Sequence, residues 1–287
     1  MKVTLIINPR SGKRQAVTLV KAAQVMAAEL GHELEVAAID RPGHGTILAQ
    51  EALSSGRERI ISIGGDGTLN AIACGLLGSG LPLGIVPMGS GNGYARSLGL
   101  PLDPHQALRH AFTGTTRWMD ICYLNDIPFL GTAGIGFDAR VAAQFDLSHS
   151  RGLLGYARII IREIIGAPAM NVSLTVDGHT ERHMVLMLVF CNTREFGNKA
   201  VISPGSIPND GVAELRVVRK PGLLPLMRAF VQIYTGRADR SPYITNIRCT
   251  KARVWQEGVL AHLDGEPMEI GHDVRFRLER EQLCVVA

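Results

Sequence analysis

The segment Ile61–Asn70, with the sequence ISIGGDGTLN, is the most informative stretch of this 287-residue chain. It joins a β-branched run, typical of a buried strand, to the helical spacing of residues 68–77. The consecutive glycines let the backbone approach a ligand closely, and the start of the helix offers free N–H groups to phosphate. Asp66 can orient the phosphates or hold Mg²⁺ through water. Taken alone, however, the glycines favour a plainer interpretation, a tight strand-to-helix turn.

Two further polar loops follow neighbouring strands. NPRSG (Asn8–Gly12) comes after the first strand, and PMGSGNG (Pro87–Gly93) after the strand that follows the glycine segment. Because parallel strands end at the same edge of a sheet, three such loops predict a nucleotide cradle there. There is no GxxxxGK[ST], so Gly12-Lys13 is not a Walker loop. No GxGxxG opens a helix after the first strand, which disfavours dinucleotide redox chemistry.

The N-terminal region alternates between strand-like and helix-like patterns. The expected strands are Val3–Ile7, Leu34–Ile39, Arg59–Ile63 and Leu83–Val86, and the expected helices are 13–30, 44–53 and 68–77, with a short helix after Gly93. Such alternation predicts a parallel sheet covered by helices on both faces. We therefore expect the chain to be α/β, with a doubly wound nucleotide domain over residues 1–118.

After Trp118 the pattern changes to short strand-like runs separated by turn signals. These runs are Met119–Tyr123, Ile127–Thr132, Met170–Val176, Met184–Phe190, Ala213–Val218, Thr245–Thr250 and Ala252–Gln256, and helices are expected over Gly152–Ile165 and Leu223–Tyr234. Asp177-Gly178 is a dipeptide that favours a type I′ hairpin turn. We expect residues 119–287 to form a mainly antiparallel β-sandwich, with the active site in the cleft between the domains. The C-terminal tail is a candidate to pack back on the first domain.

Composition and charge limit the class of protein and its expected location in the cell. The chain is 46% hydrophobic and 20% charged with a net charge of +4, which fits an anionic partner and an ordinary cytosolic enzyme alike. Its five scattered cysteines include no CxxC pair, which disfavours disulfides and a zinc site. The longest apolar run, Met184–Cys191, is far shorter than the ~20 residues that span a bilayer. We expect a cytoplasmic protein that visits a membrane surface transiently.

Six motifs together carry a resemblance to a known family. They are NPRSG (8–12), GGDGTLN (64–70), PMGSGNGYAR (87–96), GIGFDARV (134–141), ISPGSIPNDGVAEL (202–215) and HLDGEP (262–267). In this order they resemble the diacylglycerol kinase catalytic family, which includes bacterial lipid kinases and sphingosine and ceramide kinases. GGDGT alone is shared with NAD kinases, whereas the six motifs together are specific.

The resemblance implies roles for individual residues. It implies ATP contacts for Asn8, Pro9, Arg10, Ser11, Gly12, Gly64, Gly65, Asp66, Gly67, Thr68, Leu69, Asn70, Gly89, Ser90 and Asn92. Asp264 and Glu266 would lie near the γ-phosphate, one of them as the general base for the substrate hydroxyl, with Asp66 as a further catalytic residue. A lipid site in the C-terminal domain follows from the same resemblance.

The resemblance also implies a structural Mg²⁺ site in the C-terminal domain. There the Asp210 carboxylate would join backbone oxygens near Ile207 and Val212. A metal-free turn at Asn209-Asp210-Gly211 fits the same residues equally well.

Several positions depart from the family pattern, two of them at places where family members carry an acid. Ala71 stands where members commonly carry an acid directly after GGDGTxN, which removes one polar contact at the start of the helix. Arg140 falls where sphingosine kinases place an acid for the lipid amine, and its charge would repel a long-chain base. A neutral lipid alcohol or ceramide is therefore the expected acceptor.

The sequence thus predicts an ATP-dependent lipid kinase that transfers the γ-phosphate to a hydroxyl of diacylglycerol, ceramide or a related lipid alcohol. ATP and Mg²⁺ are the expected cofactors. The expected partner is lipid at a membrane surface, which the protein contacts only peripherally. No nucleic-acid partner is expected, and the sequence leaves open whether the protein forms a homodimer. One alternative is a soluble NAD kinase-like enzyme, disfavoured because no Asn-Glu dipeptide occurs. The other is a non-catalytic nucleotide- or lipid-binding relative, favoured slightly by Ala71 and disfavoured by the intact Asp66, Asp264 and Glu266.

Overall fold

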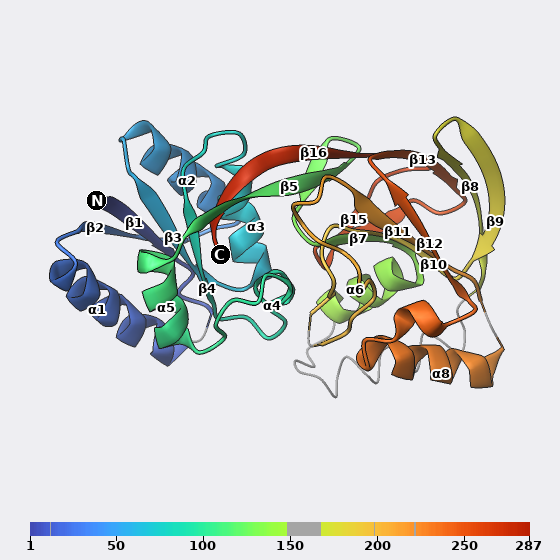
Figure 1. Cartoon of the computed structure of the whole chain (residues 1–287), viewed down its shortest axis with the longest axis horizontal. Coiled ribbons are helices and arrows are strands. Elements are labelled where there is room, and N and C mark those ends of the chain that lie inside the picture. The colour runs from blue at the N-terminus through green and yellow to red at the C-terminus, as the bar shows by residue number, and fades with distance from the viewer. Residues whose placement is uncertain (12, 148–167, 198, 221) are drawn as a thin grey trace. The chain divides into compact units, whose positions relative to one another are not determined.

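The computed structural model describes the whole chain except residues 12, 148–167, 198 and 221 (Figure 1). It divides into two compact units. Unit 1 contains Met1–Asp120 and Arg280–Ala287, and unit 2 contains Ile121–Glu279. The chain thus leaves unit 1 once and returns to it for its last residues. The helix expected over Gly152–Ile165 lies outside the described residues.

Unit 1 is built on a parallel sheet. Its strands are β1 (Lys2–Ile7), β2 (Glu33–Ala38), β3 (Arg59–Gly64) and β4 (Leu83–Pro87), hydrogen-bonded in the order β2-β1-β3-β4. The end of β16 (Asp273–Val286) adds a further parallel partner, with Val285 beside Leu83. The apolar runs of β3 and β4 are buried along their whole length, as expected for strands covered on both faces. The four predicted strands are confirmed.

Helices cover both faces of this sheet (Figure 1). The helices are α1 (Lys13–Glu29) and α5 (Pro104–Thr113) on one face, α2 (His44–Ser54) and α3 (Asp66–Cys74) on the other, and the short α4 (Gly93–Ser97) after β4. Buried side chains of α1 and α5, such as Leu19 and Phe112, pack on the sheet. The arrangement confirms the predicted doubly wound architecture.

Helix α5 was not among the predicted elements, although the sequence carries its start signal. The Asp103 side chain caps the helix by accepting hydrogen bonds from the backbone N–H groups of His105 and Gln106, at 3.1 and 2.9 Å. Pro104 occupies the first turn, where its missing N–H costs nothing. An Asp-Pro pair before an apolar periodic run is therefore the local signal that predicts this helix.

Unit 2 contains two sheets of mainly antiparallel strands. The first sheet comprises β16, β13 (Lys251–Gln256), β8 (Met170–Val176) and β9 (His179–Val185), with β5 (Thr116–Leu124) paired to β16 and β6 (Ile127–Phe129) paired to β5. The second sheet has six strands, in the order β12 (Ile244–Cys249), β11 (Ala213–Val218), β10 (Met187–Cys191), β7 (Thr132–Gly136), β14 (Leu260–Leu263) and β15 (Glu266–Glu269). The β8–β9 turn has positive φ at Asp177 and Gly178, 51° and 80°, as a type I′ hairpin requires.

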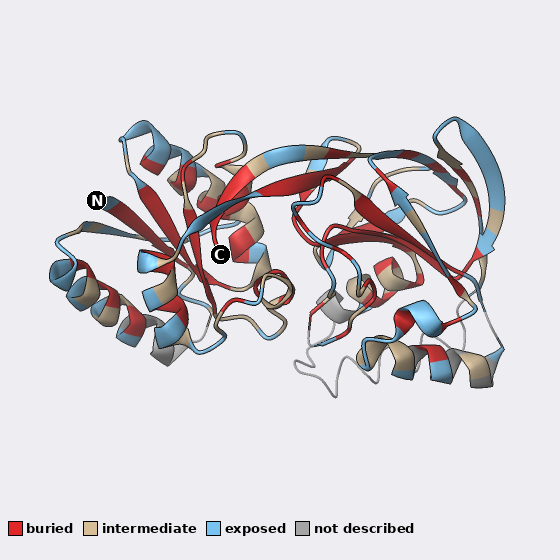
Figure 2. Ribbon diagram, in the orientation of Figure 1, coloured by how far each residue is buried: buried red, intermediate tan, exposed pale blue. Residues whose placement is uncertain are grey.

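The core of unit 2 lies between these two sheets. Phe190 of β10 and Phe276 of β16 stack across it with ring centroids 4.4 Å apart. Figure 2 shows the strands around this interior largely buried. The predicted β-sandwich is confirmed. Two segments that were predicted as single strands are divided in the structure. Ile127–Thr132 is broken between β6 and β7, where backbone N–H groups of residues 130–132 bond to the Asp264 side chain. Met184–Phe190 is divided between β9 and β10 at Leu186.

Three helical segments complete unit 2. They are α6 (Phe137–Leu147), α8 (Leu223–Tyr234) and the 3₁₀ turn η1 (Ala238–Arg240). The predicted helix over Leu223–Tyr234 is confirmed, whereas α6 was not predicted as a helix. No helix within the described residues is long and apolar enough to cross a membrane.

Candidate active site

The first two polar loops of unit 1 are tied together by Asn8. Its Nδ2 donates to Thr68 Oγ1 at 3.0 Å, while its Oδ1 accepts from the Arg10 backbone N–H at 3.0 Å. The Thr68 side chain in turn occupies the space over Gly64, where an added Cβ would lie 2.5 Å from Thr68 Cβ. Asn8, Gly64 and Thr68 therefore fix each other's positions through this contact.

The second and third loops of unit 1 touch backbone to backbone. A Cβ added to Gly89 would lie 2.8 Å from Gly65 Cα, so this approach needs glycine. The Met88 N–H also donates to the Gly64 carbonyl at 2.7 Å. Asn92 closes its own loop by exchanging two hydrogen bonds of 2.9 Å with the Gly89 backbone. The structure thus brings the three loops together at the carboxyl ends of β1, β3 and β4, as predicted from the sequence.

Asp66 connects two of these loops. Its carboxylate accepts hydrogen bonds from the backbone N–H groups of Gly93 and Tyr94, at 3.2 and 3.4 Å, at the start of α4. From the sequence, Asp66 is expected to orient phosphates or hold Mg²⁺. The structure adds a role in holding the third loop against the second.

The start of α3 is suited to bind an anion. Gly65 is its N-cap residue, and within the described residues no side-chain hydrogen bond caps this helix end. The N–H groups of its first turn can therefore serve phosphate, which the helix dipole also favours. Of the other predicted ATP contacts, Pro9, Arg10, Gly67 and Ser90 are exposed, Ser11 and Asn70 are half-buried, and the Leu69 side chain is in the core; Gly12 lies outside the described residues.

In unit 2, Asp264 and Gly265 form the tight turn between β14 and β15, with φ of 50° and 86°. The Asp264 carboxylate accepts hydrogen bonds from the backbone N–H groups of Leu130, Gly131 and Thr132, at 2.8, 2.8 and 3.1 Å. These are the contacts that interrupt the strand expected over residues 127–132. Asp264 therefore anchors the β6–β7 connection, and Glu266 stands exposed at the start of β15.

A pocket of about 110 Å³ lies beside this turn. Its apolar lining includes Phe137, Val141, Ala142, Met187, Phe196 and Ile233. Asp138, His262, Thr132 and Gly265 line it as well. The pocket thus combines a mostly apolar wall with a few polar groups, a composition typical of sites for apolar ligands. Asp138 and His262 belong to the motifs at residues 134–141 and 262–267, but the sequence alone assigns neither of them a role.

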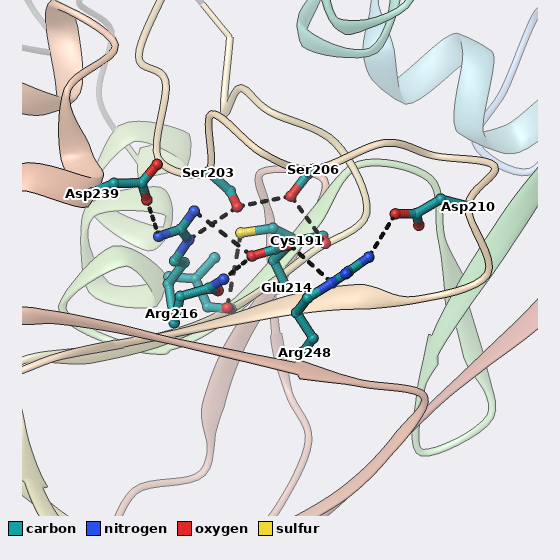
Figure 3. Close-up of polar contacts among 10 residues, drawn as sticks. Cys191, Ser203, Ser206, Asp210, Glu214, Arg216, Asp239 and Arg248 are labelled. Atoms are coloured by element: carbon teal, nitrogen blue, oxygen red, sulfur yellow. Dashed lines mark hydrogen bonds and ion pairs between the residues drawn. The ribbon is translucent and has the colours of Figure 1, made fainter.

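The predicted metal site lies in a network of ion pairs (Figure 3). Asp210 Oδ2 lies 2.9 Å from a guanidinium nitrogen of Arg248, and Asp210 Oδ1 accepts from the Val212 N–H at 3.2 Å. The Ile207 carbonyl accepts from the Asp210 N–H at 3.4 Å. Arg248 Nε also lies 3.5 Å from Glu214. One guanidinium therefore faces both carboxylates.

A second guanidinium supports the same network from below the surface. Arg216 is only 2% exposed, and its donors reach Ser203 Oγ at 3.0 Å and Asp239 Oδ1 at 2.5 Å. Burial in this region raises the pKa of the neighbouring Cys191 thiol far above its usual range, which keeps it protonated and unreactive. The buried Arg216 and the surface Arg248 neutralise carboxylates that a cation would otherwise balance.

In this arrangement the Asp210 carboxylate is paired with Arg248, and the Ile207 carbonyl accepts the Asp210 N–H. Mg²⁺ requires near-octahedral oxygen coordination. No cluster of three or more His, Cys, Asp or Glu side chains suited to a metal occurs within the described part of the chain. Asp210, Ile207 and Val212 therefore stay a prediction as metal ligands, and no chemical step is derived through a metal there.

Comparisons with known proteins agree with this architecture. Residues 2–124 match the diacylglycerol kinase catalytic domain, and residues 131–285 match the YegS C-terminal NAD kinase beta sandwich-like domain. A probable lipid kinase YegS-like protein of Chromohalobacter salexigens is 31% identical over 99% of this chain and 92% of its own. A diacylglycerol kinase of Mycobacterium tuberculosis is 29% identical over 92% of this chain and 88% of its own.

Solved structures show the same fold. Two from Bacillus anthracis, the second named a diacylglycerol kinase, cover 99% of this chain and 96% of their own with TM-scores of 0.80 and 0.74, at 21% and 19% identity. The two matched domains coincide with the sequence motifs in each half of the chain. The chain therefore belongs to the diacylglycerol kinase catalytic-domain family of lipid kinases, with a C-terminal domain of the YegS type.

Proposed function

We propose that this protein transfers the γ-phosphate of ATP to a hydroxyl of a neutral lipid alcohol such as a diacylglycerol or ceramide. The observation that carries the proposal is the largely apolar pocket of unit 2, beside the Asp264-Gly265 turn. An apolar wall suits hydrocarbon and offers little to a water-soluble acceptor such as NAD. Relatives named as diacylglycerol kinase support the same class of acceptor.

The nucleotide would bind to the three loops of unit 1. Membership in a kinase family implies ATP as the phosphate donor, and the N–H groups at the start of α3 suit its phosphates. Mg²⁺ carried with ATP would neutralise charge on the transferring phosphoryl group. Asn8, Thr68 and Asp66 would keep the loops in the shape that the phosphates require, because they connect one loop to the next.

Glu266 is the general base in this proposal, and Asp264 is its anchor. An alcohol becomes an effective nucleophile when a carboxylate accepts its proton. Both Asp264 oxygens already accept backbone N–H groups, whereas Glu266 stands exposed at the first position of β15. Asp264 therefore fixes the turn that presents Glu266, and this assigns different tasks to the two acids that the sequence could not separate.

The test is phosphate transfer from labelled ATP to a panel of dispersed lipids. The panel holds diacylglycerol, monoacylglycerol, ceramide, sphingosine and phosphatidylglycerol, with NAD as the soluble alternative. Wild-type protein is expected to label a neutral lipid alcohol, and Glu266→Gln to lower kcat by about 10²- to 10⁴-fold. Glu269→Gln, an exposed acid on the same strand, is the matched control and should retain activity. Label on NAD, or ATP binding without transfer to any acceptor, would contradict the proposal.

Lipid substrates reside in membranes, so the protein is also proposed to contact a membrane surface peripherally and transiently. The net charge of +4 favours an anionic surface modestly. Co-sedimentation with vesicles of neutral and anionic composition measures this contact. Binding that is absent from both kinds of vesicle, while dispersed lipid is phosphorylated, would remove the membrane step and leave the reaction in place.

A further inference from the structure

Helix α8 closes one side of the unit 2 pocket from outside the second sheet. Ile233 and Tyr234, near its C-terminal end, line the pocket together with residues of α6. Ala229, one turn before Ile233, is buried. Figure 1 shows α8 on the same side of this sheet as α6. The inner side of the helix therefore packs on unit 2 and borders the pocket.

The outer side of α8 has few charges for a surface helix. Arg228, Val231 and Thr235 follow one another at spacings of three and four residues, which places them on one face, and all three are exposed. Val231 is 58% exposed. Arg228 is the one charged residue in the 12-residue sequence of the helix, whereas a helix that faces water typically carries a charged stripe. The outer face therefore presents an apolar side chain beside a single cation.

Positive charge is concentrated in the segment around α8. Residues 219–243 contain five basic residues and one acid. The basic residues, all of them exposed, are Arg219, Lys220, Arg228, Arg237 and Arg240. Their surplus over the acid equals the net charge of the whole chain, +4, so the formal charges of all other residues cancel. The excess charge of this protein therefore belongs to the two ends and the outer face of α8.

The one acid of this segment already has a partner inside the domain. Asp239 of η1 lies 2.5 Å from a guanidinium nitrogen of Arg216, whose side chain is 2% exposed. This ion pair uses the Asp239 charge to balance a buried cation, so it offers little to the exposed cations nearby. It also ties η1 to β11. Arg237 and Arg240 are therefore held beside the end of α8 by an anchored turn.

We propose that the outer face of α8, together with the cations at its two ends, is the surface by which the protein docks on an anionic membrane. This inference rests on the proposed function and names the surface that serves its lipid site. Anionic headgroups attract Arg and Lys, and an exposed apolar side chain enters the interface between headgroups and acyl chains. Because Ile233 and Tyr234 of the same helix line the pocket, a lipid would pass from bilayer to pocket across about the width of one helix, ~10 Å.

A second cationic face of unit 2 fits a membrane less well. It lies on β13 and β16, where Arg253 pairs with Asp273, and Arg277 pairs with both Asp126 and Glu279. These carboxylates reduce the attraction of the face for anionic headgroups. The face also belongs to the first sheet, and the residues described as lining the pocket come from the second sheet, its connections, α6 and α8. A membrane bound there would be separated from the pocket by the sandwich itself.

The first test removes charge. The double variant Arg228→Gln, Arg237→Gln loses two cations at α8, and the control Lys251→Gln, Arg275→Gln loses two exposed cations from β13 and β16. Binding is measured by co-sedimentation with vesicles of phosphatidylcholine, with and without phosphatidylglycerol, in the absence of ATP. Each cation near an anionic surface contributes about fivefold to partitioning, so we expect about 25-fold weaker binding to the anionic vesicles for the α8 variant. The control should stay within about threefold of wild type.

The second test changes the apolar contact. Val231→Glu places a carboxylate on the outer face of α8, where it meets anionic headgroups and loses the apolar contact, so we expect about tenfold weaker binding or more. Val25→Glu is the matched control, because Val25 is 59% exposed on helix α1 of unit 1 and the substitution changes the net charge equally. Thermal melting of each variant shows that the fold is retained, which is expected at such exposed positions.

Phosphate transfer separates docking from chemistry. The acceptors are dioleoylglycerol embedded in anionic vesicles and dihexanoylglycerol dissolved as a monomer. The α8 variants should lower transfer to the embedded lipid about tenfold or more, because they weaken the vesicle contact. Transfer to the dissolved lipid should stay within about threefold in kcat/KM, since neither Arg228 nor Val231 is among the residues described as lining the pocket.

This inference and the kinase proposal fail in different ways. If wild type binds neither kind of vesicle, or if the α8 variants bind no more weakly than their controls, the docking surface is overturned, and transfer to dissolved lipid still supports the kinase. If the α8 variants alone lose vesicle binding while wild type transfers phosphate to no lipid, the docking surface stands and the kinase proposal falls.

Discussion

The candidate sites of the two units differ in the groups that form them, main chain in unit 1 and side chains in unit 2. In unit 1 the cradle consists of main chain: glycines that touch at Gly65 and Gly89, and N–H groups at the start of α3. In unit 2 the candidate site consists of side chains from separate elements, with Asp138 of α6 and His262 of β14 brought together in an apolar wall. A site made of backbone demands glycine at fixed places, whereas a site made of side chains demands correct packing of a whole domain. Substitutions should therefore damage the two sites in different ways.

The largest effect is expected where the side-chain site itself depends on a glycine. Gly134→Ala places a methyl group 1.7 Å from the Asp138 carboxylate, so that side chain must shift and its contact with His262 is disturbed. We expect a loss of about 3 kcal/mol in the free energy of unfolding, since overpacking typically costs 1–3 and here meets a charged pair. Urea unfolding measures it. Gly205→Ala, whose new Cβ meets nothing nearer than 3.9 Å, is the control, and equal stability of the two variants would refute this account.

Gly89→Ala should damage function more than stability. Its Cβ would lie 2.8 Å from Gly65 Cα, so the two loops must separate by a few tenths of an ångström. We expect about tenfold to 100-fold weaker ATP binding by titration calorimetry, which corresponds to roughly 1.4–2.8 kcal/mol. Lipid binding should be unchanged, because the proposed lipid pocket belongs to the other unit. Equal weakening of lipid and ATP binding would show that the two sites are not separable.

Asp264→Asn tests whether this acid is an anchor. The variant keeps one acceptor oxygen and turns an amide group toward N–H donors, so at least one of the three bonds to residues 130–132 is lost. We expect about 1–2 kcal/mol of destabilisation together with reduced activity. Asp177→Asn, at the equivalent place in the exposed β8–β9 turn, is the control. Full stability combined with lost activity would instead make Asp264 the base.

The smallest effect is expected at the ion-pair network of Figure 3. Because Arg248 already balances Asp210 and Glu214, chelation of divalent ions should leave the melting temperature of the protein unchanged. Arg248→Gln should cost less than about 1 kcal/mol, since its side chain is 59% exposed. Differential scanning calorimetry with EDTA or Mg²⁺ measures both. If EDTA lowers the melting temperature of the wild type but not that of Asp210→Asn, the metal site that the family resemblance implies would be supported.

The contrast between the units also explains what the sequence could reveal. The parallel strands and the loops of unit 1 were predictable because buried β-branched runs and glycine clusters are local signals. Helix α5 also has a local signal, at Asp103-Pro104, although it was not among the predicted helices. In unit 2, α6 begins inside a segment that was noted only as a motif, and the break between β6 and β7 depends on Asp264, more than 130 residues away.

The candidate site was predictable to the same uneven degree. The residues of the three loops were identified from the sequence, and the structure brings them together. The Asp138–His262 contact joins residues 124 positions apart, so no local pattern announces it. The proposed division of tasks between Asp264 and Glu266 depends on which backbone N–H groups lie near each carboxylate, and this is a property of the folded domain alone.

Strand β16 has a consequence for the order in which the protein can fold during synthesis. Its last residues, Arg280–Ala287, belong to unit 1, where the Ala287 N–H donates to the Thr115 carbonyl at 2.9 Å and Gln282 accepts from Gly78 at 2.8 Å. A ribosome therefore delivers most of the nucleotide unit first and its closing strand last, after all of unit 2. Until the roughly 160 residues of unit 2 have been synthesised, the edge of the unit 1 sheet at β4 therefore lacks its partner strand β16.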